Sequence, residues 1–410
     1  MLQLPKRLFL PLVLVTVIKY YVKFTEFIKD LTLLKNLSAL NFQEATAIQT
    51  QVFNAAHLES DLLIISPTGT GKTEAYVLPI VMKLITQKPP AAPSVLIITP
   101  TRELVLQTTD RIQKLCKETD IKALAIYGGQ SYDTTREALA TKPAILVASL
   151  GRLLDLLDKG WLKVDDIKIL VIDEADELLA MGFMQPLQVL LGKLNPTSHK
   201  WMISATFNPE TQKLASKILK KPLEIKSSLS QNKMEERVLF VDKQDKKQLI
   251  TYLLQIHQFD QIIVFTRTTH AVDRIVKHLH QQGIRAAGLY GDKKQAERAR
   301  VLDQLINKDI TVLIATDIAT RGIDITSLQA IINYEVPDNL ETYIHRIGRS
   351  ARGTSTGRAY TFCDHEDNDK LIQLHRQLNK SIPVEDDHPY MANWQRGLLK
   401  STVKSKKKRK

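Results

Sequence analysis

Two short stretches hold residues whose types and spacing suit the handling of a nucleoside triphosphate. The first, SPTGTGKT at 66–73, follows an apolar run, precedes a stretch typical of a helix, and departs from the phosphate-loop pattern G-x-x-x-x-G-K-[ST] only at Ser66. In such a loop, backbone N–H groups bind phosphate oxygens, the lysine pairs with the β- and γ-phosphates, and the Thr hydroxyl reaches Mg²⁺. A plain strand–helix turn is the alternative. The residues expected to bind the phosphates and Mg²⁺ are Ser66, Thr68, Gly69, Thr70, Gly71, Lys72 and Thr73.

The second stretch, VIDEAD at 171–176, is an apolar run that ends in acids. Adjacent buried carboxylates are costly without a cation nearby, so this pattern favours a Mg²⁺ site. Asp173 would hold Mg²⁺ through water, and Glu174 would orient and deprotonate an attacking water. The alternative is an exposed acidic turn at the start of the next helix.

Two further segments are predicted to connect this site to other parts of the chain. Ser204 and Thr206 of ISAT follow an apolar run, and their hydroxyls are expected to bond to the turn that holds Asp176. HRIGRSAR at 345–352 gathers three arginines, Arg346, Arg349 and Arg352, around a glycine. Guanidinium groups in such a place stabilise charge that develops on a γ-phosphate. The alternative is a solvated basic stretch or a clamp for nucleic-acid phosphates.

The elements that must position these residues form a repeating pattern of short apolar runs and longer helical stretches. The runs lack polar alternation, as expected for strands buried on both faces of a parallel sheet. We expect strands at 62–66, 94–100, 123–127, 144–149, 167–174 and 201–206, and again at 238–242, 261–267, 285–291, 312–317, 330–336 and 357–362. This alternation predicts an α/β protein with two doubly wound parallel-sheet domains in tandem.

The expected boundaries follow from composition. An atypical extension would occupy 1–23, the nucleotide-binding domain 24–222, a polar linker 223–236, the second domain 237–385, and a basic tail 386–410. The segment from Lys400 to Lys410 holds seven basic residues, and without it the formal net charge falls from +13 to +6. Positive charge favours a polyanionic partner such as nucleic acid. The presence of only two cysteines, without a C-x-x-C motif, indicates a reducing compartment and argues against a zinc site.

The first residues do not fit the rest of the chain. Lys6 and Arg7 precede an apolar run at 8–18 that contains Pro11. This run is too short to span a bilayer, and no small-residue cleavage site follows it. A signal or anchor, a real extra segment, and a start site placed too far upstream are the three interpretations. We expect the native chain to begin near Val22.

Taken together, these motifs resemble the DEAD-box RNA helicases of superfamily 2, which are named for the letters at 173–176. The resemblance runs from Phe24 to about Phe362, with the motifs in family order. It implies two RecA-like domains, ATP and Mg²⁺ as ligands, and ATP hydrolysis stimulated by RNA. Phe24 and Gln49 would recognise adenine, because a carboxamide can bond to its N6 and N7, and Asp324 would contact the nucleotide. Arg349 and Arg352 would act as arginine fingers, while His345 and Arg346 would link to the DEAD segment.

The resemblance also implies an RNA groove shared by the two domains, with contacts mainly to phosphate and 2′-OH groups. The residues that match its RNA-gripping segments are Thr101, Arg102, Gly129, Ser149 and Arg152 in the first domain, and Arg267, Gln295, Arg298, Thr316 and Arg321 in the second. ATP and RNA together would close the domains, bend one strand and separate a short duplex.

Several positions depart from the family pattern, but none removes a catalytic group. Asn41 stands where Gly is usual, Ala45 and Ala47 replace prolines, Leu150 replaces another proline, and Glu177 follows DEAD where a base is common. Two other functions stay open: an ATPase that acts on DNA, and an ATP-dependent RNA clamp that remains closed. The short basic extension resembles bacterial helicases of ribosome assembly or cold adaptation, the SrmB kind among them. We therefore expect a cytoplasmic monomer that acts on a ribonucleoprotein or ribosomal precursor, without a membrane.

Overall fold

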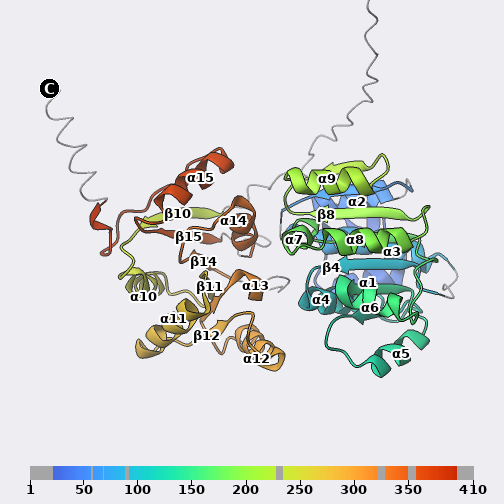
Figure 1. The fold of residues 1–410 in the computed structure, drawn as a ribbon, viewed down its shortest axis with the longest axis horizontal. Helices are drawn as coiled ribbons and strands as arrows, with labels where there is room; N and C mark the ends of the chain where they lie inside the picture. Colours follow the sequence, from blue (N-terminus) through green and yellow to red (C-terminus); the bar gives the residue numbers. More distant parts are fainter. Residues whose placement is uncertain are drawn as a thin grey trace, which may run out of the picture.

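The chain folds into two α/β domains, each built on a parallel sheet (Figure 1). The structure is a computed structural model and describes residues 22–56, 59–67, 69–87, 92–227, 234–320, 328–349 and 357–394. Helices lie on both sides of each sheet, which is the doubly wound arrangement expected from the sequence (Figure 1).

The first domain holds a seven-stranded parallel sheet in the order β5-β6-β4-β7-β8-β3-β9. Its strands are β3 (Leu62–Ile65), β4 (Val95–Thr99), β5 (Ala123–Ile126), β6 (Ile145–Ser149), β7 (Ile169–Ile172), β8 (His199–Ser204) and β9 (Leu223–Lys226). A two-stranded antiparallel ladder of β1 (Val22–Lys23) and β2 (Glu44–Ala45) precedes it, with a short 3₁₀ turn at Phe24–Glu26. The helices are α1 (Leu31–Ala39), α2 (Ala47–Ala56), α3 (Lys72–Ile85), α4 (Arg102–Leu115), α5 (Tyr132–Ala140), α6 (Leu150–Asp158), α7 (Ala175–Ala180), α8 (Met184–Lys193) and α9 (Pro209–Ile218).

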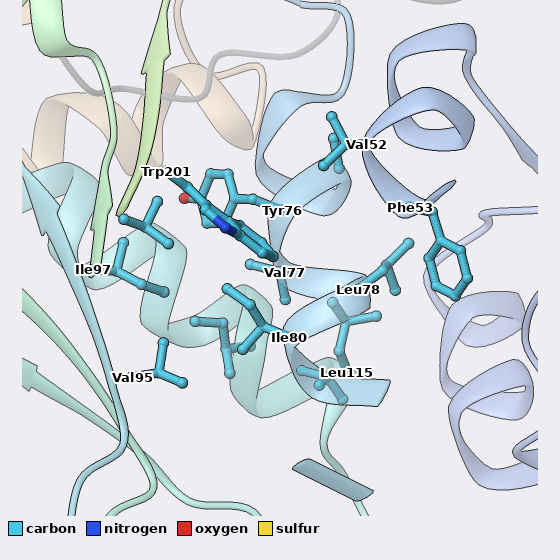
Figure 2. Close-up of a cluster of buried hydrophobic side chains, with 14 of the residues drawn as sticks. Val52, Phe53, Tyr76, Val77, Leu78, Ile80, Val95, Ile97, Leu115 and Trp201 are labelled. Carbon is cyan, nitrogen blue, oxygen red and sulfur yellow. The ribbon is translucent and has the colours of Figure 1, made fainter. Parts of the chain in front are cut away.

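Alternate residues of these strands enter two separate cores. In β4, Val95 and Ile97 pack into the cluster under α1 to α4, whereas Leu96 and Ile98 pack into the cluster under α6 to α9. All four side chains are almost completely buried. Burial on both faces explains why the strands appear in the sequence as continuous apolar runs. Figure 2 shows part of the first cluster, where side chains of α3 and the sheet meet around Tyr76 and Trp201.

The second domain holds a six-stranded parallel sheet in the order β10-β15-β14-β11-β13-β12. Its strands are β10 (Glu235–Phe240), β11 (Ile262–Phe265), β12 (Ala286–Leu289), β13 (Val312–Ala315), β14 (Ala330–Asn333) and β15 (Arg358–Cys363). Its helices are α10 (Lys246–His257), α11 (Thr269–Gln281), α12 (Gln295–Ile306), α13 (Asp317–Thr320), α14 (Leu340–Ile347) and α15 (Asn368–Leu378). Every predicted strand of both domains is present within a few residues of its expected bounds.

Three predicted boundaries differ from the structure. The stretch 223–236, expected as a linker, contains β9, which pairs with β3 at the edge of the first sheet, and the first residues of β10. The expected tail, 386–410, begins too early, because Met391 bridges to Val241 and the Ala392 N–H donates to the Phe240 carbonyl. Residues 386–394 therefore belong to the second domain and cover β10, an edge strand that would otherwise expose unpaired backbone groups.

The amino-terminal ladder also moves a boundary. Val22 and Lys23 pair with Ala45 and Glu44, so these two residues belong to the first domain and not to the extension. The predictions for 1–21 lie outside the described residues. Within the part of the chain that the structure describes, no helix combines the length and apolar character needed to cross a bilayer.

Candidate ATP and RNA site

The phosphate loop connects β3 to α3 at the carboxyl edge of the sheet. β3 lies beside β8, and the Ser66 N–H donates to the Ser204 carbonyl across the two strand ends. Gly71 adopts φ +86°, and a Cβ at this position would lie 2.5 Å from the Gln49 amide nitrogen. Glycine is therefore required at Gly71 both for its left-handed backbone and for the close approach of Gln49.

Side chains within the loop bond to its own backbone. The Lys72 ammonium donates to the Ser66 carbonyl at 2.9 Å. The Thr70 hydroxyl donates to the Pro67 carbonyl at 2.9 Å and contacts the Ser66 hydroxyl at 2.7 Å. Since the single Thr70 hydroxyl proton points to Pro67, Ser66 is the donor to Thr70. Ser66, the one residue that departs from the phosphate-loop pattern, thus helps to hold the loop, and its side chain is fully buried.

Both predicted adenine contacts, Gln49 and Phe24, are buried. Gln49 is held between the Thr46 N–H, which donates to its carboxamide oxygen at 2.8 Å, and the Gly71 carbonyl, which accepts from its amide at 3.2 Å. It therefore connects the segment at 46–49 to the phosphate loop. Phe24 is 2% exposed and packs edge-on against Phe27 in the core. A nucleotide would not reach the Phe24 ring in this arrangement.

Asp173 and Glu174 lie at the carboxyl end of β7, beside β8 and close to the phosphate loop. Asp173 is buried, and burial raises the pKa of its carboxyl while Lys72 and a hydrogen bond from Tyr76 act to lower it. Glu174 has φ 49° and ψ 52°, a left-handed conformation that is uncommon for a non-glycine residue and often found at active sites. Burial and the neighbouring Asp173 raise the pKa of Glu174, whereas Arg349, His345 and Lys72 lower it. A raised pKa suits a carboxylate that must accept a proton near neutral pH.

Of the two hydroxyls predicted to bond to the turn at 173–176, the DEAD turn, that of Thr206 does so and that of Ser204 does not. The Thr206 N–H and hydroxyl both donate to Asp176 Oδ2 at 2.8 Å, and the Ser204 hydroxyl donates to the Thr206 carbonyl at 2.6 Å. Although burial alone would raise the pKa of Asp176, contacts with His345 and Thr206 and the charge of Lys72 hold it well below its usual range. Asp176 is therefore a buried carboxylate that stays ionised.

The second domain reaches this turn through α14. His345 Nδ1 lies 2.5 Å from Glu177 Oε1, and Nε2 lies 3.5 Å from Asp176 Oδ2. Burial would lower the pKa of His345, but the two carboxylates outweigh it and raise the pKa to about 9. A small cavity between the domains is lined by Glu177, Phe265, Asp317, Thr320, Thr342, His345, Arg346 and Arg349. The imidazolium of His345 thus joins the two domains directly above the DEAD turn.

Arg346, in α14, and Arg349, just after it, lie in different surroundings. Arg346, which was expected to link to the DEAD segment, instead forms a bidentate pair with Asp317 at 2.6 and 2.7 Å and donates to Asn333. These partners lie in its own domain, so Arg346 holds α14 against the ends of β13 and β14. Arg349 is 8% exposed and lines the cavity between the domains. Its charge lowers the pKa of Glu174, which places Arg349 of the second domain within electrostatic reach of the expected catalytic base.

The RNA-gripping residues predicted in the first domain gather at one end of α4 and α6. Thr101 caps α4 by accepting a hydrogen bond from the Leu104 N–H, and the Arg102 guanidinium stacks on Tyr127, 4.4 Å from the ring centroid. Gly129, at φ +87°, lies beside Arg102. Arg152 donates to the Gln130 carbonyl and to Asp155 and stacks on Tyr132, following Ser149 at the start of α6.

The corresponding residues of the second domain contact the first domain or their own fold. Arg298 pairs with Glu103 at 3.1 Å, and Gln295 donates to the same Glu103 carboxylate at 3.3 Å. Arg267 bonds instead to Asp367 and to the Val336 carbonyl within its own domain. Thr316 is almost buried at the end of β13. Arg298 and Gln295 therefore join α12 to α4 across the domain boundary.

Each of the two domains matches a known helicase family. Residues 46–214 match the DEAD/DEAH box helicase family, and residues 245–354 match the helicase conserved C-terminal domain. The DEAD-box ATP-dependent RNA helicase CshA of Bacillus cereus is 33% identical over 358 residues, which are 87% of this chain and 68% of that protein. This chain belongs to the DEAD-box helicase family.

Two other DEAD-box relatives extend the comparison. CshA of Bacillus subtilis is 34% identical over 365 residues, which are 88% of this chain and 73% of that protein. The structure of S. cerevisiae Dbp5 bound to RNA and ADP BeF3 covers 89% of this chain and 95% of its own, at 25% identity and a TM-score of 0.78. Both sheets of this DEAD-box protein thus have the tandem RecA-like arrangement expected from its sequence.

Four predicted site residues lie outside the described part of the chain: Thr68, Arg321, Asp324 and Arg352. Three contacts were not predicted. Glu103 follows Thr101 and Arg102, which were predicted to contact RNA, but its pairing with Arg298 of the second domain was not predicted. Glu177 was noted only as a departure from the DEAD-box pattern, and Tyr76, which bonds to Asp173, carried no signal in the sequence.

Proposed function

We propose that this DEAD-box ATP-dependent RNA helicase completes its ATPase site by closing its two domains. The observation that carries the proposal is the contact of His345 with Asp176 and Glu177, together with the electrostatic effect of Arg349 on Glu174. Both second-domain residues meet the DEAD turn only when the domains are together. Hydrolysis would then depend on closure, which makes ATP and RNA binding reciprocal.

Each residue of the site has a role that its surroundings support. Lys72 would leave the Ser66 carbonyl and pair with the β- and γ-phosphates, and Glu174, with its raised pKa, would take a proton from the attacking water. Arg349 would stabilise charge on the γ-phosphate, and the family resemblance assigns Arg352 the same role and Asp324 a contact with the nucleotide.

The oxygen donors present fit a Mg²⁺ ion, which prefers hydroxyl and carboxylate ligands. Thr73, at the start of α3, and Asp173, at the end of β7, would hold it. When bound, Mg²⁺ neutralises charge on the phosphates.

The RNA groove would run along the side where α4 meets α12. Thr101, Arg102, Gly129, Ser149 and Arg152 lie near the amino ends of α4 and α6, where backbone N–H groups favour phosphate. The structure of a relative, S. cerevisiae Dbp5, contains RNA and ADP BeF3, which supports RNA as the ligand. In the second domain, Gln295, Arg298 and Thr316 would complete the groove, with Arg321 assigned by resemblance and Arg267 holding its neighbours in place.

We further propose that the protein acts in the cytoplasm as a monomer on a ribonucleoprotein or ribosomal precursor, and the formal net charge of +13 supports the polyanionic partner in this assignment. Crosslinking the protein to RNA in cells and sequencing the bound fragments would test this assignment. Enrichment of ribosomal precursor RNA is the expected result, and an unselective sample of cellular RNA would contradict it.

A Glu174→Gln variant tests the proposed mechanism. It keeps the shape of the side chain but removes the base, so RNA-stimulated hydrolysis should fall on the order of 10²- to 10⁴-fold. The closed complex with ATP and RNA should persist, which fluorescence anisotropy of a labelled RNA would detect as slow dissociation. If turnover continued at the wild-type rate, another group would have to be the base.

A further inference from the structure

Tyr76 connects the phosphate-loop helix to the carboxylate that is proposed to hold Mg²⁺. It lies on α3, four residues after Lys72, and its side chain is completely buried. Its hydroxyl donates to Asp173 Oδ2 at 2.8 Å. Figure 2 shows Tyr76 projecting from α3 toward the sheet, among apolar side chains that include Val77, Ile97 and Trp201. A hydroxyl in such surroundings costs free energy unless it is bonded, so this contact is a specific one.

Both oxygens of the Asp173 carboxylate have a donor. Oδ2 accepts from Tyr76, and Oδ1 accepts from the Glu174 N–H at 2.9 Å. A phenol keeps its proton at neutral pH, so the Tyr76 hydroxyl is the donor in this pair. Two donors on different oxygens fix the rotation of the carboxylate and leave its remaining lone pairs in defined directions.

Tyr76 also reaches the helix that begins the expected RNA contacts. The buried side chain of Thr108, on α4, interacts with the phenol. The same helix starts with Arg102 and carries Glu103, which pairs with Arg298 of the second domain. The phenol is therefore enclosed by the phosphate-loop helix α3, by the end of β7 that holds Asp173, and by α4. The last of these carries both the expected RNA contact Arg102 and the interdomain contact Glu103.

We propose that Tyr76 is a positioning residue whose hydroxyl orients the Asp173 carboxylate for Mg²⁺–nucleotide binding. The proposal rests on the assignment of Asp173 as the metal-holding residue. It concerns orientation and not catalysis, because the Tyr76 side chain is completely buried and bonds to Asp173.

A Tyr76→Phe variant removes the hydroxyl and keeps the ring that fills the core. The measurement is binding of a fluorescent ADP analogue while Mg²⁺ is titrated from a chelated baseline. In the variant, the Mg²⁺ concentration for half-maximal binding should rise about five- to tenfold, in line with the loss of one hydrogen bond to a charged group. Nucleotide binding in the chelator should stay unchanged. In turnover, KM for Mg–ATP should rise more than kcat falls.

Tyr343→Phe is the matched control. Tyr343 is also completely buried, and its hydroxyl donates to the Glu236 carboxylate at 2.5 Å, away from the phosphate loop. Both variants lose a buried phenol–carboxylate bond, so both should unfold at a lower temperature, but only Tyr76→Phe should change the Mg²⁺ dependence. An equal Mg²⁺ dependence in wild type and Tyr76→Phe would overturn the proposal.

An Asp173→Asn variant separates this proposal from the assignment on which it rests. Suppose that Asp173→Asn raises the Mg²⁺ concentration for half-maximal binding and Tyr76→Phe does not. Asp173 then holds the metal without help from Tyr76, and only the positioning role is wrong. If Asp173→Asn itself leaves the Mg²⁺ dependence unchanged, the metal-site assignment is wrong, and the proposal for Tyr76 falls with it.

Discussion

His345 Nδ1 lies 2.5 Å from Glu177 Oε1, and this pair joins the two domains at the turn that carries Glu174, the proposed catalytic base. The same imidazole lies 3.5 Å from Asp176 Oδ2, whose other contacts are the N–H and hydroxyl of Thr206. Closure of the domains is thus linked, through a single protonated side chain, to the DEAD turn and to the segment at 203–206.

Closure should depend on pH because His345 titrates differently in the two states. In the closed arrangement its pKa is raised to about 9, whereas a histidine outside this contact has the ordinary value of 6.5. A raised pKa stabilises closure fully below the ordinary value, and this stabilisation is lost as pH rises through about 9. RNA affinity in the presence of a non-hydrolysable ATP analogue should therefore fall between these values, measured by anisotropy of labelled RNA.

Glu177→Gln serves as the comparison for this pH profile. The variant removes one of the two carboxylates that raise the pKa of His345, so the fall in RNA affinity should be smaller and should end at a lower pH. Identical profiles for wild type and Glu177→Gln would show that the pair does not control closure.

The pair of Glu103 and Arg298 should contribute to cooperativity between ATP and RNA. Both side chains are mostly buried at 3.1 Å, so their interaction is screened less than that of a surface pair. Glu103→Gln and Arg298→Gln should each weaken the mutual enhancement of ATP and RNA binding. The loss of enhancement in the double variant should be about fivefold smaller than the product of the two single losses, which corresponds to a coupling energy of roughly 1 kcal/mol. Lys35→Gln, which breaks an exposed pair with Glu118, is the control and should leave it unchanged. Strictly multiplicative effects would show that the two residues act independently.

Much of this architecture could be predicted from the sequence, for a physical reason. Strands buried on both faces, such as β4 and β7, are continuous apolar runs, and the acids Asp173 and Asp176 follow directly after one of them. Edge elements carry a weaker signal. β9 (LEIK) buries only Ile225, so its polar residues suggested a linker. Met391 and Ala392 are two apolar residues within a polar segment, which is too short a run to predict a strand contact.

Partners that lie far apart in the chain could not be predicted from residue types. Arg346 was expected at the DEAD turn but pairs with Asp317, because the end of β13 brings that carboxylate under α14. Tyr76 and Asp173 are 97 residues apart in the sequence, and only the fold brings α3 and the end of β7 together. Such pairings depend on the order of the strands, which residue spacing does not specify.

Gly71→Ala should abolish nucleotide binding, because the new Cβ would meet the Gln49 amide and force a left-handed residue to carry a side chain. Stability should also fall, by about 1–3 kcal/mol, as expected for strain at such a backbone position. Gly160→Ala is the control: it has φ +68° but nothing within 4 Å of a new Cβ, so it should lower only the melting temperature. Normal ATP affinity in Gly71→Ala would contradict the requirement for close approach.

Ser66→Ala should strengthen nucleotide binding. The Ser66 hydroxyl holds Thr70, and the Ser66 carbonyl holds Lys72, so this form of the loop directs its polar groups to its own oxygens and not to phosphates. Removing one hydrogen bond of about 1 kcal/mol lowers the cost of leaving this form, which corresponds to an ATP affinity up to about fivefold higher. Equilibrium binding of a fluorescent ATP analogue measures the change.

Thr70→Val provides the reciprocal variant. It removes the acceptor of the Ser66 hydroxyl and the donor to Pro67, so it should raise nucleotide affinity at least as much, provided that Thr70 binds phosphate only through its backbone. The double variant should gain little beyond Thr70→Val alone, since both changes break the same Ser66–Thr70 bond. An unchanged or lower affinity in Ser66→Ala would mean that the hydroxyl bond belongs to the nucleotide-binding form of the loop. Ser66 would then preorganise the site, and the departure from glycine at the first position would favour phosphate binding.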